Sequence, residues 1–266
     1  MNALPMDHDL TQLLRGFDYE PGRLTARVIA LADGREVLQI RVELGLLQME
    51  CEGRPDGKPS VIAAQKAAGD DPAMRTKSRP HPAHDDSPRA SSSSADYESH
   101  AKLTTEIAAA IRLEIVQFQH RAVAFLALDD APRALADAQT ALEGAAMLCS
   151  RAEASEREWA EGMSFSILVL RTRAMCAALK SVGRVRDAGA AIDGGLALMR
   201  EVAERVGIVG RFDVLGDVAA LRALRDTLTP QLPPAQRSEF EARLFAAIRA
   251  ENYELAAILR DELRLL

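Results

Sequence analysis

The sequence predicts a mainly α-helical protein with a small antiparallel β module near its N-terminal end. Apolar residues recur at steps of three and four through most of residues 101–266, which is the spacing of one helix face. The hydrophobic content of 48% is carried mainly by Ala, Leu and Val, with 4% aromatic residues, and this composition favours packed helices. The one convincing β signal is an alternating segment on both sides of Asp33-Gly34.

We expect four parts along the 266 residues. Residues 1–57 would form a small α+β module, in which a hairpin around Asp33-Gly34 leads into a third strand. Residues 58–100 include a Pro/Ser-rich tract with too little apolar content to order itself, which predicts a disordered linker. Residues 101–229 would form a helical bundle, and residues 234–266 a C-terminal helical hairpin.

The predicted bundle is similar to tetratricopeptide helix pairs. Small residues stand on both sides of the turn at Asp129-Asp130, where the two helices of such a pair cross, namely Ala122, Ala134, Ala138 and Ala141. A second copy of the pattern surrounds Ala188, but it follows Ala134 at more than the roughly 34 residues of a tetratricopeptide repeat. The resemblance implies a concave peptide-binding surface, and a plain helical bundle is the alternative.

The C-terminal hairpin is predicted from two apolar helix faces separated by a polar break. One face carries Leu244, Ala247 and Ile248, and the other carries Ala256, Leu259, Leu263 and Leu266. Asn252 in the break suits a turn or a helix cap. From the residues alone, the simplest interpretation is a terminal hairpin that covers a core.

The same hairpin resembles the UVR motif of the bacterial excision-repair proteins UvrB and UvrC. The matching residues are an aromatic-Glu pair, an Ala pair and an Arg-Asp-Glu before an aliphatic residue: Tyr253-Glu254, Ala256-Ala257 and Arg260-Asp261-Glu262-Leu263. The N-terminal segment, with Tyr19-Glu20-Pro21-Gly22 and Leu44-Gly45-Leu46, is similar to that of bacterial proteins that contain a UVR motif.

In that family the hairpin docks onto proteins, so the resemblance implies an interaction module and no reaction. The residues that it implies for the contact are Tyr253, Glu254, Ala256, Ala257, Leu259, Arg260 and Leu263. The apolar members would be buried in the contact, while Arg260 and Glu254 would set specificity by charge.

Several functional classes are disfavoured by the sequence. The net charge of −6 argues against a general DNA-binding surface, which needs a basic excess. We find no phosphate-binding loop, and the three cysteines are widely separated, so we predict no catalytic residue, no cofactor and no metal. His81, His84, Asp85 and Asp86 lack a second anchored cluster and are not expected to bind metal. With no membrane-length apolar run and no cationic leader, we expect a cytoplasmic protein without a membrane partner.

Together these observations predict a non-catalytic adaptor that binds proteins through the hairpin and the bundle. Its partner would be a UVR-containing protein, another helical-hairpin protein or a second copy of itself, as a homodimer. The alternative is an accessory factor of nucleotide excision repair with direct DNA contact. The net negative charge of the chain argues against this alternative. A third hypothesis is an enzyme with a site between the β module and the bundle.

Overall fold

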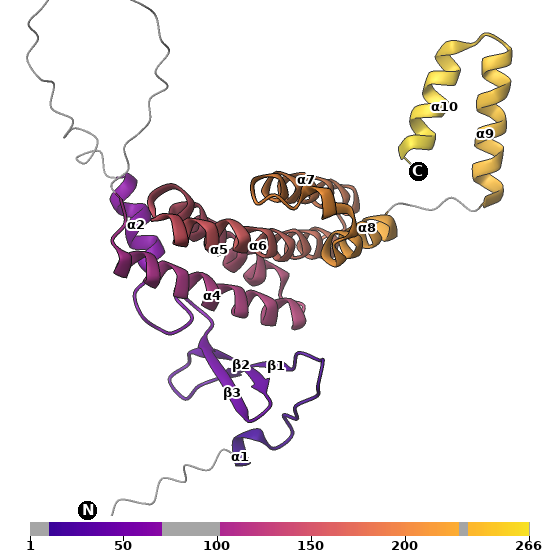
Figure 1. The fold of residues 1–266 in the computed structure, drawn as a ribbon. Coiled ribbons are helices and arrows are strands. Elements are labelled where there is room, and N and C mark those ends of the chain that lie inside the picture. The colour runs from indigo at the N-terminus through magenta and orange to yellow at the C-terminus, as the bar shows by residue number, and fades with distance from the viewer. Residues whose placement is uncertain (1–10, 71–101, 229–233, 266) are drawn as a thin grey trace, which may run out of the picture.

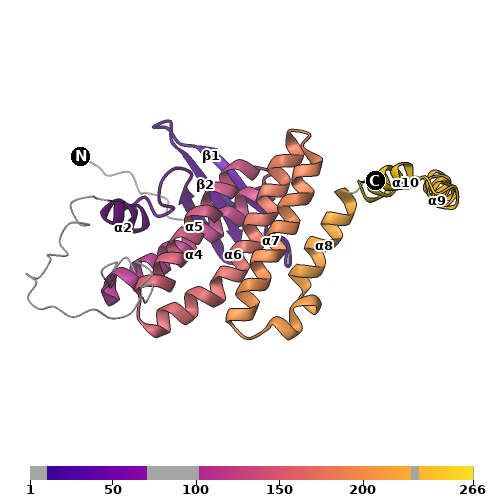
Figure 2. The same cartoon turned by 90° about the horizontal axis from the view of Figure 1, so that it is seen from above.

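The computed structural model describes residues 11–70, 102–228 and 234–265. The chain is mainly helical, with a small three-stranded antiparallel sheet at its N-terminal end (Figure 1), so the predicted fold class is confirmed at this level. Helices α4 to α8 follow one another side by side (Figure 2), and each packs against the next one along the chain.

The β module consists of helix α1 (Thr11–Leu14) and strands β1 (Ala26–Ala30), β2 (Glu36–Val42) and β3 (Gly45–Glu50). The sheet order is β1-β2-β3, and both strand pairs are antiparallel. The predicted hairpin around Asp33-Gly34 is present: the Gly34 N–H donates to the Leu31 carbonyl at 3.0 Å, and Gly34 has a φ of +84°. A positive φ is the conformation that glycine adopts without strain.

One face of the sheet packs on the helices. Leu38, Met49 and Cys51 share a hydrophobic cluster with Ala124 and Phe125. On the other face the Arg27 guanidinium donates to Gln39, and the Gln39 amide donates to Gln48. The small sheet thus gains the covering element that an isolated three-stranded sheet needs.

The bundle contains α4 (Thr105–Ala127), α5 (Ala131–Arg151), α6 (Ala154–Ser181), α7 (Val185–Arg205), the 3-10 helix η1 (Val209–Val214) and α8 (Gly216–Leu228). The turn between α4 and α5 uses the predicted acidic pair: Asp129 has a φ of 59°, and the Asp130 carboxylate accepts from the Arg133 N–H at 3.2 Å as an N-cap. Ala122 and Ala138 are fully buried and pack together with Leu170 of α6. Small residues therefore lie where the helices are close.

Helix α2 (Val61–Asp70) was not expected. The prediction of a disordered linker from residue 58 is wrong for residues 61–70, and residues 71–100 of that linker lie outside the described residues. Ile62 is 1% exposed and belongs to the bundle core, where a Cβ on Gly144 would lie 2.7 Å from its Cδ1. The packing of Ile62 into the bundle core, with its close approach to Gly144, thus orders a segment that was predicted to belong to a linker.

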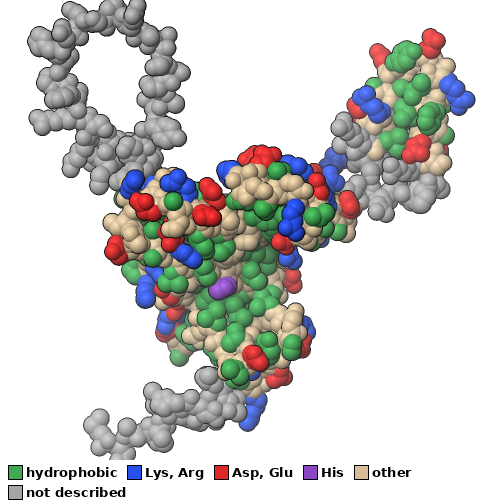
Figure 3. Space-filling model, viewed as in Figure 1, with side chains coloured by type: hydrophobic (Ala, Val, Ile, Leu, Met, Phe, Trp, Pro, Cys, Tyr) green, Lys and Arg blue, Asp and Glu red, His purple; other side chains and the backbone are tan. Residues whose placement is uncertain are grey.

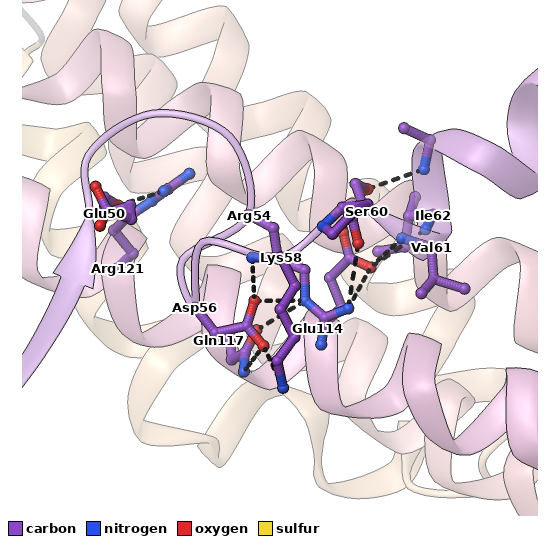
Figure 4. Close-up of polar contacts among 12 residues, drawn as sticks. Glu50, Arg54, Asp56, Lys58, Ser60, Val61, Ile62, Glu114, Gln117 and Arg121 are labelled. Atoms are coloured by element: carbon purple, nitrogen blue, oxygen red, sulfur yellow. Dashed lines mark hydrogen bonds and ion pairs between the residues drawn. The ribbon is translucent and has the colours of Figure 1, made fainter.

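The start of α2 is fixed by a carboxylate from α4. Glu114, which is 0% exposed, accepts hydrogen bonds from the N–H groups of Val61 and Ile62 at 2.8 and 3.2 Å and from the Ser60 hydroxyl at 2.5 Å (Figure 4). A carboxylate at a helix N-terminus satisfies free N–H groups and complements the helix dipole. Glu114 is thereby a structural acid.

Helix α6 has a length and a mean hydropathy that would also suit a membrane span, and among the described residues it alone does so. The expectation that no segment approaches such a span is therefore wrong on length and composition. In this structure α6 packs against α4, α5 and α7, and eight of its residues are buried.

Candidate protein-interaction surface

The C-terminal hairpin consists of α9 (Pro234–Arg249) and α10 (Tyr253–Leu265). The reversal between them is built from Glu251, which has a φ of 57°, and Asn252. The Asn252 side chain accepts from the Leu255 N–H at 3.1 Å, and its own N–H donates to the Ala247 carbonyl at 3.0 Å. Asn252 thus ends one helix and caps the next, as the sequence predicts.

A small core of its own holds the hairpin together. Ala247, Ala256 and Leu259 are at most 8% exposed, and Phe240 and Leu244 pack against them. All five residues belong to α9 or α10, and the hairpin stands apart from α8 in both views (Figures 1 and 2). Small side chains at Ala247 and Ala256 let the two helices approach closely.

Outside this core the hairpin presents large apolar side chains to solvent. The exposed fractions are 62% for Phe245, 46% for Ile248, 69% for Tyr253, 41% for Leu255 and 56% for Ile258. Figure 3 shows apolar side chains gathered on the visible face of the hairpin, with charged ones at its margins. A helix with apolar residues outside its core face exposes surface that a partner can cover.

The predicted contact residues divide into three groups. Ala256 and Leu259 are buried inside the hairpin, where they pack in its own core, and their contact with a partner stays a prediction. Ala257 and Leu263 are half-buried. Tyr253, Glu254 and Arg260 are exposed, and Arg260 pairs with the neighbouring Asp261 at 2.8 Å.

Three exposed apolar residues were not predicted from the sequence: Phe245, Leu255 and Ile258. Ile248 was assigned to the inner face of its helix, but the structure turns it outward. The signal that could have found them is a second i, i+3 pair on each helix, at 245 and 248 and at 255 and 258, beside the core stripe. A helix with two apolar stripes carries more apolar surface than the core of a two-helix hairpin can bury.

The bundle has an open groove of about 440 Å³ between α5, α6 and α7. Its floor includes Leu168 and Val202, and its rim carries Cys149, Glu161 and Arg205. Burial raises the pKa of the Cys149 thiol, and the nearby Glu161 carboxylate raises it further. Cys149 is thus disfavoured as a thiolate nucleophile.

The polar groups between the β module and the bundle are paired with one another. Arg54, on the loop after β3, forms an ion pair with Asp56 at 2.9 Å and donates to Gln117 of α4 at 3.3 Å (Figure 4). The hydrogen bonds from Lys58 N–H and Gln117, with the Arg54 charge, outweigh desolvation and lower the pKa of Asp56. These groups fix the loop against α4.

Within the described residues no group of three or more His, Cys, Asp or Glu side chains is arranged to hold a metal ion. The four residues weighed as metal ligands, His81, His84, Asp85 and Asp86, lie outside the described residues.

The fold and surface define a helical-bundle protein with a small sheet on one side and a terminal hairpin that exposes apolar side chains. Comparison of the chain with protein families, with curated proteins and with solved structures gives no match. The UVR and tetratricopeptide resemblances therefore stay predictions from the residues themselves.

Proposed function

We propose that this chain is a non-catalytic adaptor that binds another protein through the α9–α10 hairpin. The observation that carries the proposal is the hairpin's exposed apolar surface, made of Phe245, Ile248, Tyr253, Leu255 and Ile258, which we call the outer hairpin surface. Interface centres are enriched in aromatic and aliphatic residues of this kind.

The hairpin also has the shape of a docking element. Its internal core comprises residues of its own two helices, so it can keep its fold while a partner covers the outer surface. A second helical hairpin is the matching partner, because two amphipathic helix pairs can pack into a four-helix bundle. That partner is a UVR-containing protein, another helical-hairpin protein or a second copy of the chain.

The bundle supports this proposal as a tetratricopeptide-like scaffold. Its helices pack in sequence order, and Ala122 of α4 and Ala138 of α5 are buried together with Leu170 of α6. Helices stacked in this way present grooves to peptides, and the groove between α5, α6 and α7 is the candidate second contact.

The proposal is tested by affinity capture from the native cell extract with three full-length proteins. The wild type is compared with a Phe245→Glu, Ile258→Glu double variant and with Ala246→Glu, a control at an exposed position on another face of α9. The two glutamates place charge in the outer hairpin surface but leave Ala247, Ala256 and Leu259 intact, so circular dichroism should show an unchanged helix content.

We expect one specific protein to be captured by the wild type and the control and to be lost with the double variant. If all three proteins capture the same set, the outer hairpin surface does not bind a partner and the adaptor proposal fails.

A further inference from the structure

The outer edge of β1 carries backbone groups that the sheet does not use. The Arg41 N–H donates to the Thr25 carbonyl at 2.9 Å, and the Leu31 N–H donates to the Arg35 carbonyl at 2.8 Å. Val28 pairs with Leu38, so the strands keep one register from Thr25 to Leu31. In an antiparallel pair, alternate residues form the hydrogen bonds, so the N–H and C=O groups of the odd-numbered residues of β1 point toward β2. The N–H and C=O groups of Ala26, Val28 and Ala30 therefore point away from the sheet, and none has a partner among the described residues.

The opposite edge of the sheet is closed at its end. The Glu50 N–H of β3 donates to the Pro55 carbonyl at 2.9 Å, and the Glu50 carbonyl accepts from the Arg121 guanidinium at 2.6 Å. The loop after β3 and helix α4 thus occupy the outward backbone groups at that position. Only the β1 edge is left open along its whole length in the described part of the chain.

The β1 edge also lacks the usual devices that prevent strand addition. Its sequence, Ala-Arg-Val-Ile-Ala, contains no proline, no lysine and no acidic residue. Its one charge, Arg27, is held on its own sheet: the guanidinium donates to Gln39 at 2.9 Å and to the Leu13 carbonyl at 3.0 Å, and lies 4.2 Å from the Phe17 ring centroid. Arg27 therefore does not place a charge that would repel a second strand at the β1 edge.

We propose that β1 pairs antiparallel with β1 of a second copy, about a two-fold axis at Val28, which joins the two sheets into one of six strands. This register is the one in which all three outward residues are paired, Val28 with Val28 and Ala26 with Ala30. Arg27 then lies opposite Ile29 of the second copy, so no like charges meet. A strand that is self-complementary in this way fits a two-fold contact between copies of one chain.

The dimer is expected to be weak and concentration-dependent. Pairing of two five-residue strands buries much less than the roughly 1,600 Å² of a standard interface. The contact is separate from the hairpin and does not depend on the proposed adaptor function.

The test uses full-length protein that carries Phe245→Glu and Ile258→Glu, so that association through the hairpin does not contribute. Sedimentation velocity over a concentration series gives the dimer dissociation constant. To this background we add Ile29→Lys or Ile29→Glu, a matched pair that introduces either sign of charge opposite Arg27 of the second copy. A third variant, Val28→Pro, removes an outward N–H that the β1–β2 ladder does not use.

We expect Ile29→Lys and Val28→Pro each to raise the dimer dissociation constant at least about tenfold, and Ile29→Glu to leave it equal or lower. Thermal melting checks that each variant is folded, and Val28→Pro serves as the readout if a variant at position 29 unfolds. A monomer at every concentration up to about 1 mM would overturn the proposal. Equal dissociation constants for the Lys and Glu variants would overturn it too.

Discussion

Arg121 and Asp137 form a buried bidentate ion pair that joins α4 to α5 at the place where β3 ends. The Arg121 Nε and Nη2 atoms lie 2.8 and 2.7 Å from the two carboxylate oxygens, and Nη1 donates to the Glu50 carbonyl. The guanidinium also lies 5.2 Å from the Phe118 ring centroid. One side chain thus links two helices and the sheet.

Removal of the carboxylate should therefore destabilise the whole β–α junction. Asp137→Ala leaves Arg121 charged, buried and unpaired, and we expect a loss of about 3–5 kcal/mol in the free energy of unfolding. The measurement is urea unfolding followed by circular dichroism. An apolar replacement of both partners, Arg121→Met with Asp137→Leu, should recover a large part of that loss, and an equal loss in both proteins would contradict the assignment.

Two neighbouring glycines in α7 should respond in opposite ways to alanine. A Cβ on Gly195 would lie 2.1 Å from the Thr172 hydroxyl oxygen of α6, whereas a Cβ on Gly194 would have no heavy atom within 4 Å. We expect Gly195→Ala to destabilise the bundle by about 1–3 kcal/mol through overpacking. Gly194→Ala should stabilise it by about 0.5–1 kcal/mol through helix propensity. Thermal melting of the two proteins measures the difference, and equal shifts would disprove the close crossing of α6 and α7.

The three cysteines should react slowly with alkylating reagents in the folded protein. Burial raises the pKa of the thiols of Cys51, Cys149 and Cys176, so each holds less thiolate near pH 7.5 than a free cysteine. We expect iodoacetamide labelling to be slower than in urea at all three positions, with Cys149 the least protected because it is half-buried. Mass spectrometry of labelled peptides gives the rates, and a labelling rate at Cys149 equal to that in urea would contradict its placement in the groove.

The net negative charge predicts that the protein does not bind DNA directly. With a net charge of −6, the protein lacks the cationic excess that releases counterions from DNA. We expect no electrophoretic shift of a duplex or single-stranded oligonucleotide at 50 mM salt or above. A shift that weakens steeply with added salt would instead support the alternative of an excision-repair accessory factor.

The elements of the fold with strong local patterns were predictable. The hairpin at Asp33-Gly34 follows from a turn sequence between alternating strands, and the α4–α5 pair follows from a helical period interrupted by Asp129-Asp130. In each of these, the residues that determine the structure are adjacent in the chain. The coarse fold class needs only this local information.

Helix α2 and the outer hairpin surface were not predictable in the same way. Helix α2 is held by Glu114 and Gly144, which are far from it in sequence, and it borders the Pro/Ser-rich tract from which the linker was predicted. In the hairpin, the periodicity identified apolar positions but could not decide which of them face the other helix of the same hairpin. The sequence placed Leu259 and Ile248 in similar apolar roles, and the structure buries the first and exposes the second.

Contact between the outer hairpin surface and another protein can be observed by site-specific photo-crosslinking in living cells. A photoreactive phenylalanine analogue is placed at Phe245, at Tyr253 or, as a control, at Ala246, which is exposed on another face of α9, in the full-length chain. We expect the first two positions to yield an adduct with the same protein and the control position to yield none. Adducts of equal yield at all three positions, or no adduct at Phe245 and Tyr253, would contradict the proposed contact.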